Sequence, residues 1–120
     1  MVDAYHITKV ENRESILMKG IVPGIKLLRG DLDFQRGLGV PIRSCGYDNL
    51  YGFHPVFITF NPVEAISIMG YRGSVDEWCV AVINATNLQH KPGRFSWESI
   101  TDYVPADCIK RFEPLTNFLK

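Results

Sequence analysis

His6 is the first side chain along this sequence that has the chemistry to hold a ligand. It lies in the stretch Tyr5–Thr8, in which apolar and polar residues alternate as in a short strand. An imidazole near a strand end can hydrogen-bond a ligand at the mouth of a cleft. A lone histidine more often packs inside a core, so the binding interpretation needs support from other residues.

The cysteines and histidines do not form the pattern of a metal site. Cys45, Cys79 and Cys108 are far apart, odd in number and without a Cys-x-x-Cys pair, and none of the three histidines has ligand-like spacing to them. Reduced thiols fit this pattern better than a disulfide framework. We therefore expect no metal cofactor.

Composition limits the class of protein. The chain has 120 residues, of which 46% are apolar and 22% charged, and its net charge is zero. We expect one globular domain over residues 1–120, without an overall field that attracts nucleic acid or a membrane. The longest apolar run, Trp78–Ile83, is too short to span a bilayer, and the N-terminus lacks a signal-peptide pattern. The expected location is the cytoplasm.

The first elements of the chain would position His6. Residues 3–8 predict a strand, and Asn12 can cap a following helix by accepting a bond from a free amide of its first turn. Gly20 stands where a C-cap glycine belongs. The apolar stripe of this helix comprises Ile16, Leu17 and Ile21.

The next segment is the least regular part of the sequence. Pro23-Gly24 predicts a turn and residues 25–29 a short strand. Residues 31–55 lack a clear period, apart from a short helix near residues 32–38. Irregular segments of this length are typical of lids and binding loops.

Residues 56–103 predict three strands and a helix. Val56–Phe60 is a β-branched and aromatic strand, and Asn61-Pro62 begins a helix that ends at Gly70. The apolar side of this helix comprises Ala65, Ile66 and Met69. Residues 77–84 predict a strand buried on both faces, residues 86–93 a loop and residues 95–103 a further strand.

A helical turn over residues 105–109 and a strand over residues 110–112 complete the pattern, and the tail from residue 114 stays ambiguous. The order of these elements predicts an α+β fold, with two main helices against a strongly curved small sheet.

Three blocks of this chain resemble the ADP-ribosyltransferase superfamily, in its histidine class. Tyr5–Thr8, with Asn12 and the helix to Gly20, is similar to the opening block of poly(ADP-ribose) polymerases and of DNA-targeting ADP-ribosyltransferase toxins. Val56–Thr59 resembles the nicotinamide-pocket block, and Ser96–Glu98 the strand of the catalytic glutamate. The resemblance implies a compact fold with small mixed sheets, and NAD as co-substrate without a metal.

The resemblance implies roles for the first block. His6 would hydrogen-bond a ribose hydroxyl of NAD, and the main chain of Ile7 would clamp the nicotinamide amide. Thr8 would bond the adenosine ribose, although satisfying the strand end explains it equally well.

Phe57 replaces the tyrosine of the second block, so an aromatic ring is kept and a hydroxyl is lost. It would stack on nicotinamide, or pack as an ordinary core residue. Thr59 would line the pocket. Tyr71 would supply a second stacking ring, or it is a surface aromatic.

Glu98 would be the catalytic residue. Its carboxylate would stabilise the positive charge that builds on the ribose when the nicotinamide bond breaks, and would help to deprotonate the incoming nucleophile. The alternative is an exposed strand residue.

The acceptor is the least determined part of the resemblance. Ser96 stands where arginine-modifying toxins carry Glu or Gln, which argues against an arginine acceptor. Arg29 would hold the NAD pyrophosphate, and the basic residues near it admit a nucleic acid acceptor, although solvated surface charge is the commoner reading of such a run.

The functional expectation is a mono-ADP-ribosyltransferase acting on nucleic acid or protein, with a toxin or phage-defence role among the settings it fits. The alternatives are an NAD glycohydrolase of the same fold and a catalytically silent binding module. The NAD-using RNA 2′-phosphotransferases rank last, because their Arg-His-Arg-Arg set is not found in this sequence.

Overall fold

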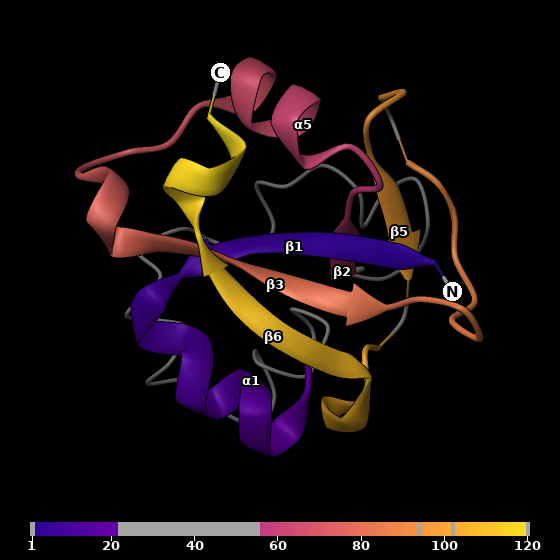
Figure 1. Ribbon diagram of the computed structural model, residues 1–120. Helices are drawn as coiled ribbons and strands as arrows, with labels where there is room; N and C mark the ends of the chain where they lie inside the picture. The colour runs from indigo at the N-terminus through magenta and orange to yellow at the C-terminus, as the bar shows by residue number, and fades with distance from the viewer. Residues whose placement is uncertain (1, 22–55, 94, 102, 120) are drawn as a thin grey trace, which may run out of the picture.

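The structure is a computed structural model, and it describes residues 2–21, 56–93, 95–101 and 103–119. Within these ranges it is an α+β domain with two helices and two three-stranded sheets (Figure 1), so the expected fold class is confirmed. The predictions for residues 22–55 lie outside the described residues. They are the turn at Pro23-Gly24, the strand over 25–29, the helix near 32–38 and the irregular loop.

The larger sheet consists of β1 (Asp3–Lys9), β3 (Trp78–Asn84) and β6 (Ile109–Pro114), in the order β1-β3-β6. Its five central β3 residues, Cys79–Ile83, are at most 3% exposed. This burial follows from the position of β3 between two neighbours and two apolar layers, as its unbroken apolar run predicted.

One helix covers each face of the larger sheet. On one face, Ile16 of α1 (Arg13–Lys19) packs in a cluster with Ile83, and α1 follows the 3-10 turn η1 (Val10–Asn12). On the other face, Ile66 of α5 (Pro62–Met69) packs with Val80 and with Leu115 of η5 (Leu115–Phe118). Alternate β3 side chains thus enter opposite cores.

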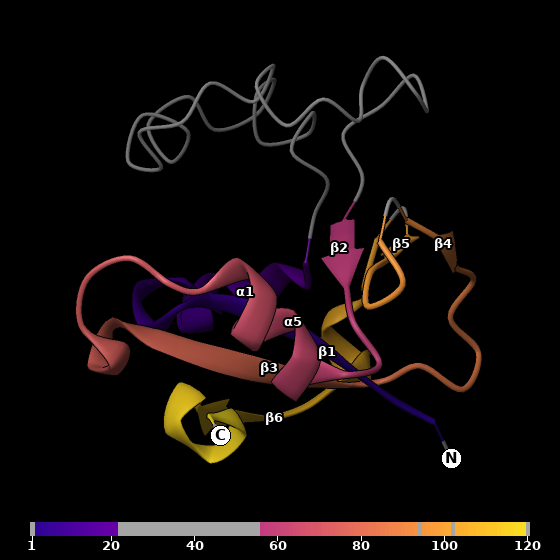
Figure 2. The same cartoon turned by 90° about the horizontal axis from the view of Figure 1, so that it is seen from above.

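The smaller sheet consists of β2 (Val56–Ile58), β5 (Ser99–Thr101) and β4 (Lys91–Pro92), in the order β2-β5-β4. Figure 2 shows these short strands side by side, beyond one end of α5. The sheets were expected to be mixed, but every strand pairing between described residues is antiparallel.

The strand predicted over residues 95–103 is shorter than expected. Only Ser99–Thr101 forms β5, and residues 95–98 form a turn in which the Glu98 amide donates to the Phe95 carbonyl at 3.0 Å. The prediction was wrong here because the alternation of apolar side chains that suggested a strand comes from the burial of Trp97 in a turn. Trp97 is only 9% exposed because it packs at the cavity described below.

The side-chain cap at the N-terminus of α5 is as predicted, whereas the cap predicted for α1 is not formed. Asn61 caps α5 by accepting from the Glu64 amide at 3.2 Å. Asn12 instead donates from Nδ2 to Oγ1 of Thr8 at 3.0 Å and makes no side-chain cap. Asn12 is the last residue of the 3-10 turn η1 and is not extended, so its side chain points back to β1.

Both helices end at glycines in the left-handed region, as expected. Gly20 has φ +76° and Gly70 has φ +68°. A Cβ on Gly20 would also collide with the backbone of Val104, so this position has two independent reasons for glycine.

Two residues assigned to apolar helix stripes are exposed. Leu17 of α1 is 56% exposed, so its assignment was wrong. Met69 of α5 is 55% exposed, but it lines the cavity described below together with Ala65. A helix of two turns has room for only one or two fully buried positions.

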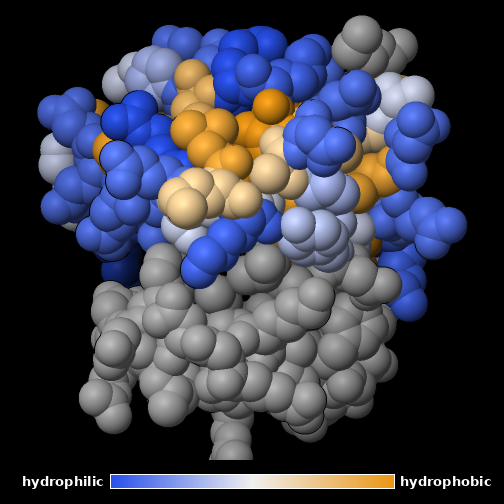
Figure 3. All heavy atoms as spheres, turned by 90° about the horizontal axis from the view of Figure 1, so that it is seen from below, coloured by the Kyte–Doolittle hydropathy of each residue, from blue (hydrophilic) through white to orange (hydrophobic). Residues whose placement is uncertain are grey.

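Figure 3 views the side on which α1 lies in Figure 1, and apolar atoms gather on its described surface. Met18, next to Leu17, is 79% exposed.

The remaining elements match the predictions except β4, which lies within the predicted loop over residues 86–93. The 3-10 turn η4 (Ala106–Cys108) leads into β6. Glu77 belongs to the 3-10 turn η3 (Val75–Glu77) and not to the strand predicted over residues 77–84. No helix in the described part of the chain is long and apolar enough to cross a membrane.

Candidate functional site

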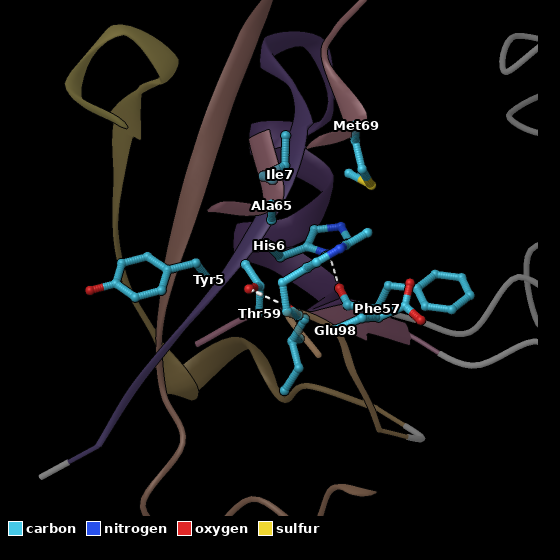
Figure 4. A pocket seen from close by; sticks show the side chains of 10 residues that line it. Tyr5, His6, Ile7, Phe57, Thr59, Ala65, Met69 and Glu98 are labelled. Carbon is cyan, nitrogen blue, oxygen red and sulfur yellow. Dashed lines mark hydrogen bonds between the residues drawn. The ribbon is translucent and has the colours of Figure 1, made fainter. Parts of the chain in front are cut away.

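A cavity of about 330 Å³ lies where β1 and β2 separate (Figure 4). Four segments line it. From β1 come Tyr5, His6 and Ile7; from β2 and its end come Phe57, Ile58 and Thr59; from α5 come Ala65 and Met69; and from the turn before β5 come Trp97 and Glu98. The structure therefore brings together five of the predicted site residues, from segments that are far apart in the sequence.

The cavity begins where the two sheets stop pairing. The Tyr5 amide donates to the Thr59 carbonyl at 2.8 Å, and the Thr59 amide donates to the Tyr5 carbonyl at 2.9 Å. Among described residues, this is the one bridge between β1 and the β2 segment. Two residues further along, the Phe57 carbonyl accepts from Nδ1 of the His6 ring at 2.7 Å instead of from a backbone amide. The ring therefore fills the point at which the strands diverge.

This hydrogen bond sets the proton arrangement of His6. A carbonyl only accepts, so Nδ1 must carry the proton, and in the neutral ring Nε2 is then an acceptor. Burial lowers the pKa of His6 from its ordinary value of 6.5, and the bond to the Phe57 carbonyl opposes this shift in part. His6 is therefore neutral at pH 7 and presents an acceptor, which suits a hydroxyl donor on a ligand.

The main chain of Ile7 faces the same gap. In an antiparallel strand the amide and carbonyl of successive residues point to opposite edges. Both groups of Tyr5 bond Thr59, on the edge away from β3, so both groups of Ile7 point to that edge as well. One extended residue offers a donor and an acceptor side by side, as a planar carboxamide requires.

Aromatic side chains form much of the apolar lining. Phe57 is half-buried in the cavity, and its β2 neighbours Val56 and Ile58 point into the core. Trp97 lines the cavity and stacks on Phe95, with ring centroids 5.2 Å apart and an interplanar angle of 3°. Flat aromatic faces of this kind suit a planar ligand ring.

Glu98 supplies a carboxylate to this apolar cavity. It is half-buried, directly before β5, and Figure 4 draws its side chain beside that of Phe57. The turn that carries it is fixed by the Thr59 hydroxyl, which donates to the Trp97 carbonyl. The same Thr59 oxygen accepts from the Asn61 amide at 3.0 Å. Thr59 thus lines the cavity, but its hydroxyl is used to tie the turn to β2 and α5.

Two other predicted site residues, Thr8 and Tyr71, do not line the cavity. Thr8 is buried and bonded to Asn12, outside the lining. Tyr71 is 40% exposed beyond the end of α5 and does not line the cavity. Arg29 lies outside the described residues.

Several residues that line the cavity were not predicted as site residues. Trp97 is the most informative of them, because a tryptophan next to the candidate glutamate is a large aromatic with a reason to be buried there. The others, Tyr5, Ile58, Ala65 and Met69, carried no local signal that separates a cavity position from a core position.

The described cysteines and acidic residues suggest no further site. Cys79 and Cys108 are free, and burial raises the pKa of the Cys79 thiol. The described residues contain no group of three or more histidine, cysteine or acidic side chains that could hold a metal ion.

Comparisons with known proteins do not assign the chain to a family. No protein-family model matches it, and no curated protein matches it significantly.

Proposed function

We propose that this protein is an NAD-dependent mono-ADP-ribosyltransferase with a compact ADP-ribosyltransferase-like fold. It would break the bond between nicotinamide and ribose and transfer ADP-ribose to a macromolecular acceptor, nucleic acid or protein. The observation that carries the proposal is the meeting of His6, Phe57 and Glu98 in one mostly apolar cavity. These are residues that the family resemblance places around the nicotinamide end of NAD.

The geometry offers a contact for each part of that end. The amide and carbonyl of Ile7 suit the carboxamide, the faces of Phe57 and Trp97 suit the pyridine ring, and Nε2 of neutral His6 suits a ribose hydroxyl. A cavity of about 330 Å³ is at the small end of ligand pockets, which span roughly 300–1,000 Å³. It would take the nicotinamide riboside part and leave the rest of NAD outside.

The reaction follows from these contacts. The bond between nicotinamide nitrogen and ribose C1′ breaks, its electron pair leaves with nicotinamide, and the ribose gains positive charge. The Glu98 carboxylate would stabilise this charge from the wall of a mostly apolar cavity. The acceptor atom then bonds C1′, and its proton passes to the same carboxylate or to solvent.

Incubation with NAD labelled in the adenylate part tests the proposal. We expect nicotinamide release, and label in DNA, RNA or protein when each is supplied. Nicotinamide release without label transfer to any acceptor would instead identify a glycohydrolase. NAD binding without release would identify a silent binding module. Absence of both binding and release would refute the NAD site.

A further inference from the structure

Gly93 lies opposite Glu98 in the hairpin that joins β4 to β5. The pairing of Pro92 with Ser99 is followed by a hydrogen bond from the Gly93 amide to the Glu98 carbonyl at 3.0 Å. Gly93 is therefore the cross-strand neighbour of Glu98, which lines the cavity.

The side chain of Glu98 lies across the Cα atom of Gly93. A Cβ added to Gly93 would be 2.5 Å from Oε1, 2.8 Å from Cγ and 3.0 Å from Cδ of Glu98. Contacts with Cγ and Cδ mean that a rotation of the carboxylate alone cannot relieve the overlap. The side chain would have to move from Cγ outwards.

Space, and not backbone conformation, explains this glycine. The glycines with positive φ among the described residues are Gly20, Gly70 and Gly73, so Gly93 has a backbone that alanine can adopt. The backbone on the other side of the contact is held, because Glu98 donates to Phe95 and Thr59 bonds the Trp97 carbonyl. An added methyl group therefore displaces a flexible side chain in preference to the turn.

We infer that Gly93 is a positioning residue for the Glu98 carboxylate, acting by the space that its missing side chain leaves. This inference rests on the proposed function for its catalytic consequence. Misplacement of a reacting group by about 1 Å can cost on the order of 100-fold in rate. The Gly93→Ala variant should thus lose turnover while folding and NAD binding are kept.

The test measures nicotinamide release at saturating NAD in Gly93→Ala, Glu98→Gln and the double variant. We expect Gly93→Ala to fall at least about tenfold, with its NAD dissociation constant within about threefold of the parent. We also expect the double variant to equal Glu98→Gln alone, because a positioning residue has nothing left to position. The inference would be overturned if Gly93→Ala lowered nicotinamide release by the same factor in the parent and in Glu98→Gln. It would also be overturned if Gly93→Ala caused no loss in the parent.

Gly73→Ala is the matched control. Gly73 also faces a glutamate carboxylate, that of Glu77, but neither residue lines the cavity. This variant should lose stability and keep its turnover.

A structural measurement separates the inference from the proposed function. The ¹³C signal of the Glu98 carboxyl, assigned by its loss in Glu98→Gln, should shift in Gly93→Ala and stay in place in Gly73→Ala. If the parent releases no nicotinamide, the proposed function fails and this shift still decides the positioning role. An unchanged signal would refute the positioning role even in an active enzyme.

Discussion

The two sheets of this protein differ in what holds their strands in place. In the larger sheet, β3 is paired on both sides and covered on both faces, and its central residues are at most 3% exposed. In the smaller sheet, strands of two or three residues depend on a turn and on single hydrogen bonds such as that of Thr59. The larger sheet carries His6. The smaller sheet carries Phe57, and its strand β5 begins directly after Glu98.

A small domain can thus combine a group on a firmly paired strand with a group on a turn that a few contacts hold. His6 projects from a strand whose register is set by seven pairs with β3. Glu98 is placed by a turn that the Thr59 hydroxyl and the burial of Trp97 hold, so small changes in that turn should alter the site without unfolding the chain.

Ile83→Ala and Ile100→Ala compare the two cores directly. Both side chains are at most 1% exposed, Ile83 in β3 and Ile100 in β5. We expect Ile83→Ala to lower the free energy of unfolding by about 4 kcal/mol and Ile100→Ala by about 2 kcal/mol, because the short sheet can collapse around the lost volume. Urea unfolding measures both. Ile68→Ala, at a residue 60% exposed, is the control, and equal losses at Ile83 and Ile100 would contradict the contrast.

Glu98→Gln keeps the shape of the side chain and removes its charge. Turnover of NAD should fall about 100-fold, the typical loss when one electrostatic contact to a transition state is removed. NAD binding, measured by calorimetry, should be kept. Glu14→Gln, on the exposed surface of α1, should leave turnover unchanged. Unchanged turnover in Glu98→Gln would remove this residue from the site.

His6→Ala removes the ring that fills the point where β1 and β2 separate. The affinity for NAD should fall about tenfold, because a hydrogen-bond acceptor worth about 1 kcal/mol and its packing are lost together. His90→Ala is the control, since His90 is exposed and contacts Phe60 instead of the cavity. Equal affinities in the parent and in His6→Ala would show that the ring does not contact the ligand.

Thr59→Val breaks the tie between β2 and the turn of Glu98. The buried Trp97 carbonyl and the Asn61 amide both lose a partner, so stability should fall by about 1–2 kcal/mol. Turnover should fall more than NAD binding, because the turn carries the carboxylate. Thr116→Val, at an exposed threonine, is the control for both measurements. A loss of stability with full turnover would separate Thr59 from the site.

The smallest expected effect is the pH dependence through His6. Its pKa is lowered in the folded chain, so between that pKa and the ordinary value of 6.5 the unfolded chain binds more protons. Stability therefore rises with pH through this window. Below the folded pKa, Nε2 is protonated and can no longer accept, so NAD affinity should fall. A titration of affinity in the parent and in His6→Gln checks this, and the same acid loss in both would assign it elsewhere.

The elements whose residues act locally could be predicted from the chain alone. The apolar run of β3, the Asn61-Pro62 start of α5 and the glycines that end both helices could be identified because propensity, capping and chain chirality depend on neighbours in the chain. The family resemblance pointed to His6, Phe57 and Glu98 as site candidates.

How these residues meet depends on contacts between segments that are far apart in the chain. The separation of β1 from β2 depends on the long-range bridge between Tyr5 and Thr59, and no local pattern encodes it. Residues 95–98 alternate like a strand, yet burial of Trp97 and the bond from Thr59 hold them as a turn. The space that Gly93 leaves for Glu98 exists only because β4 and β5 pair in one register, and register is set by the whole sheet and not by either strand alone.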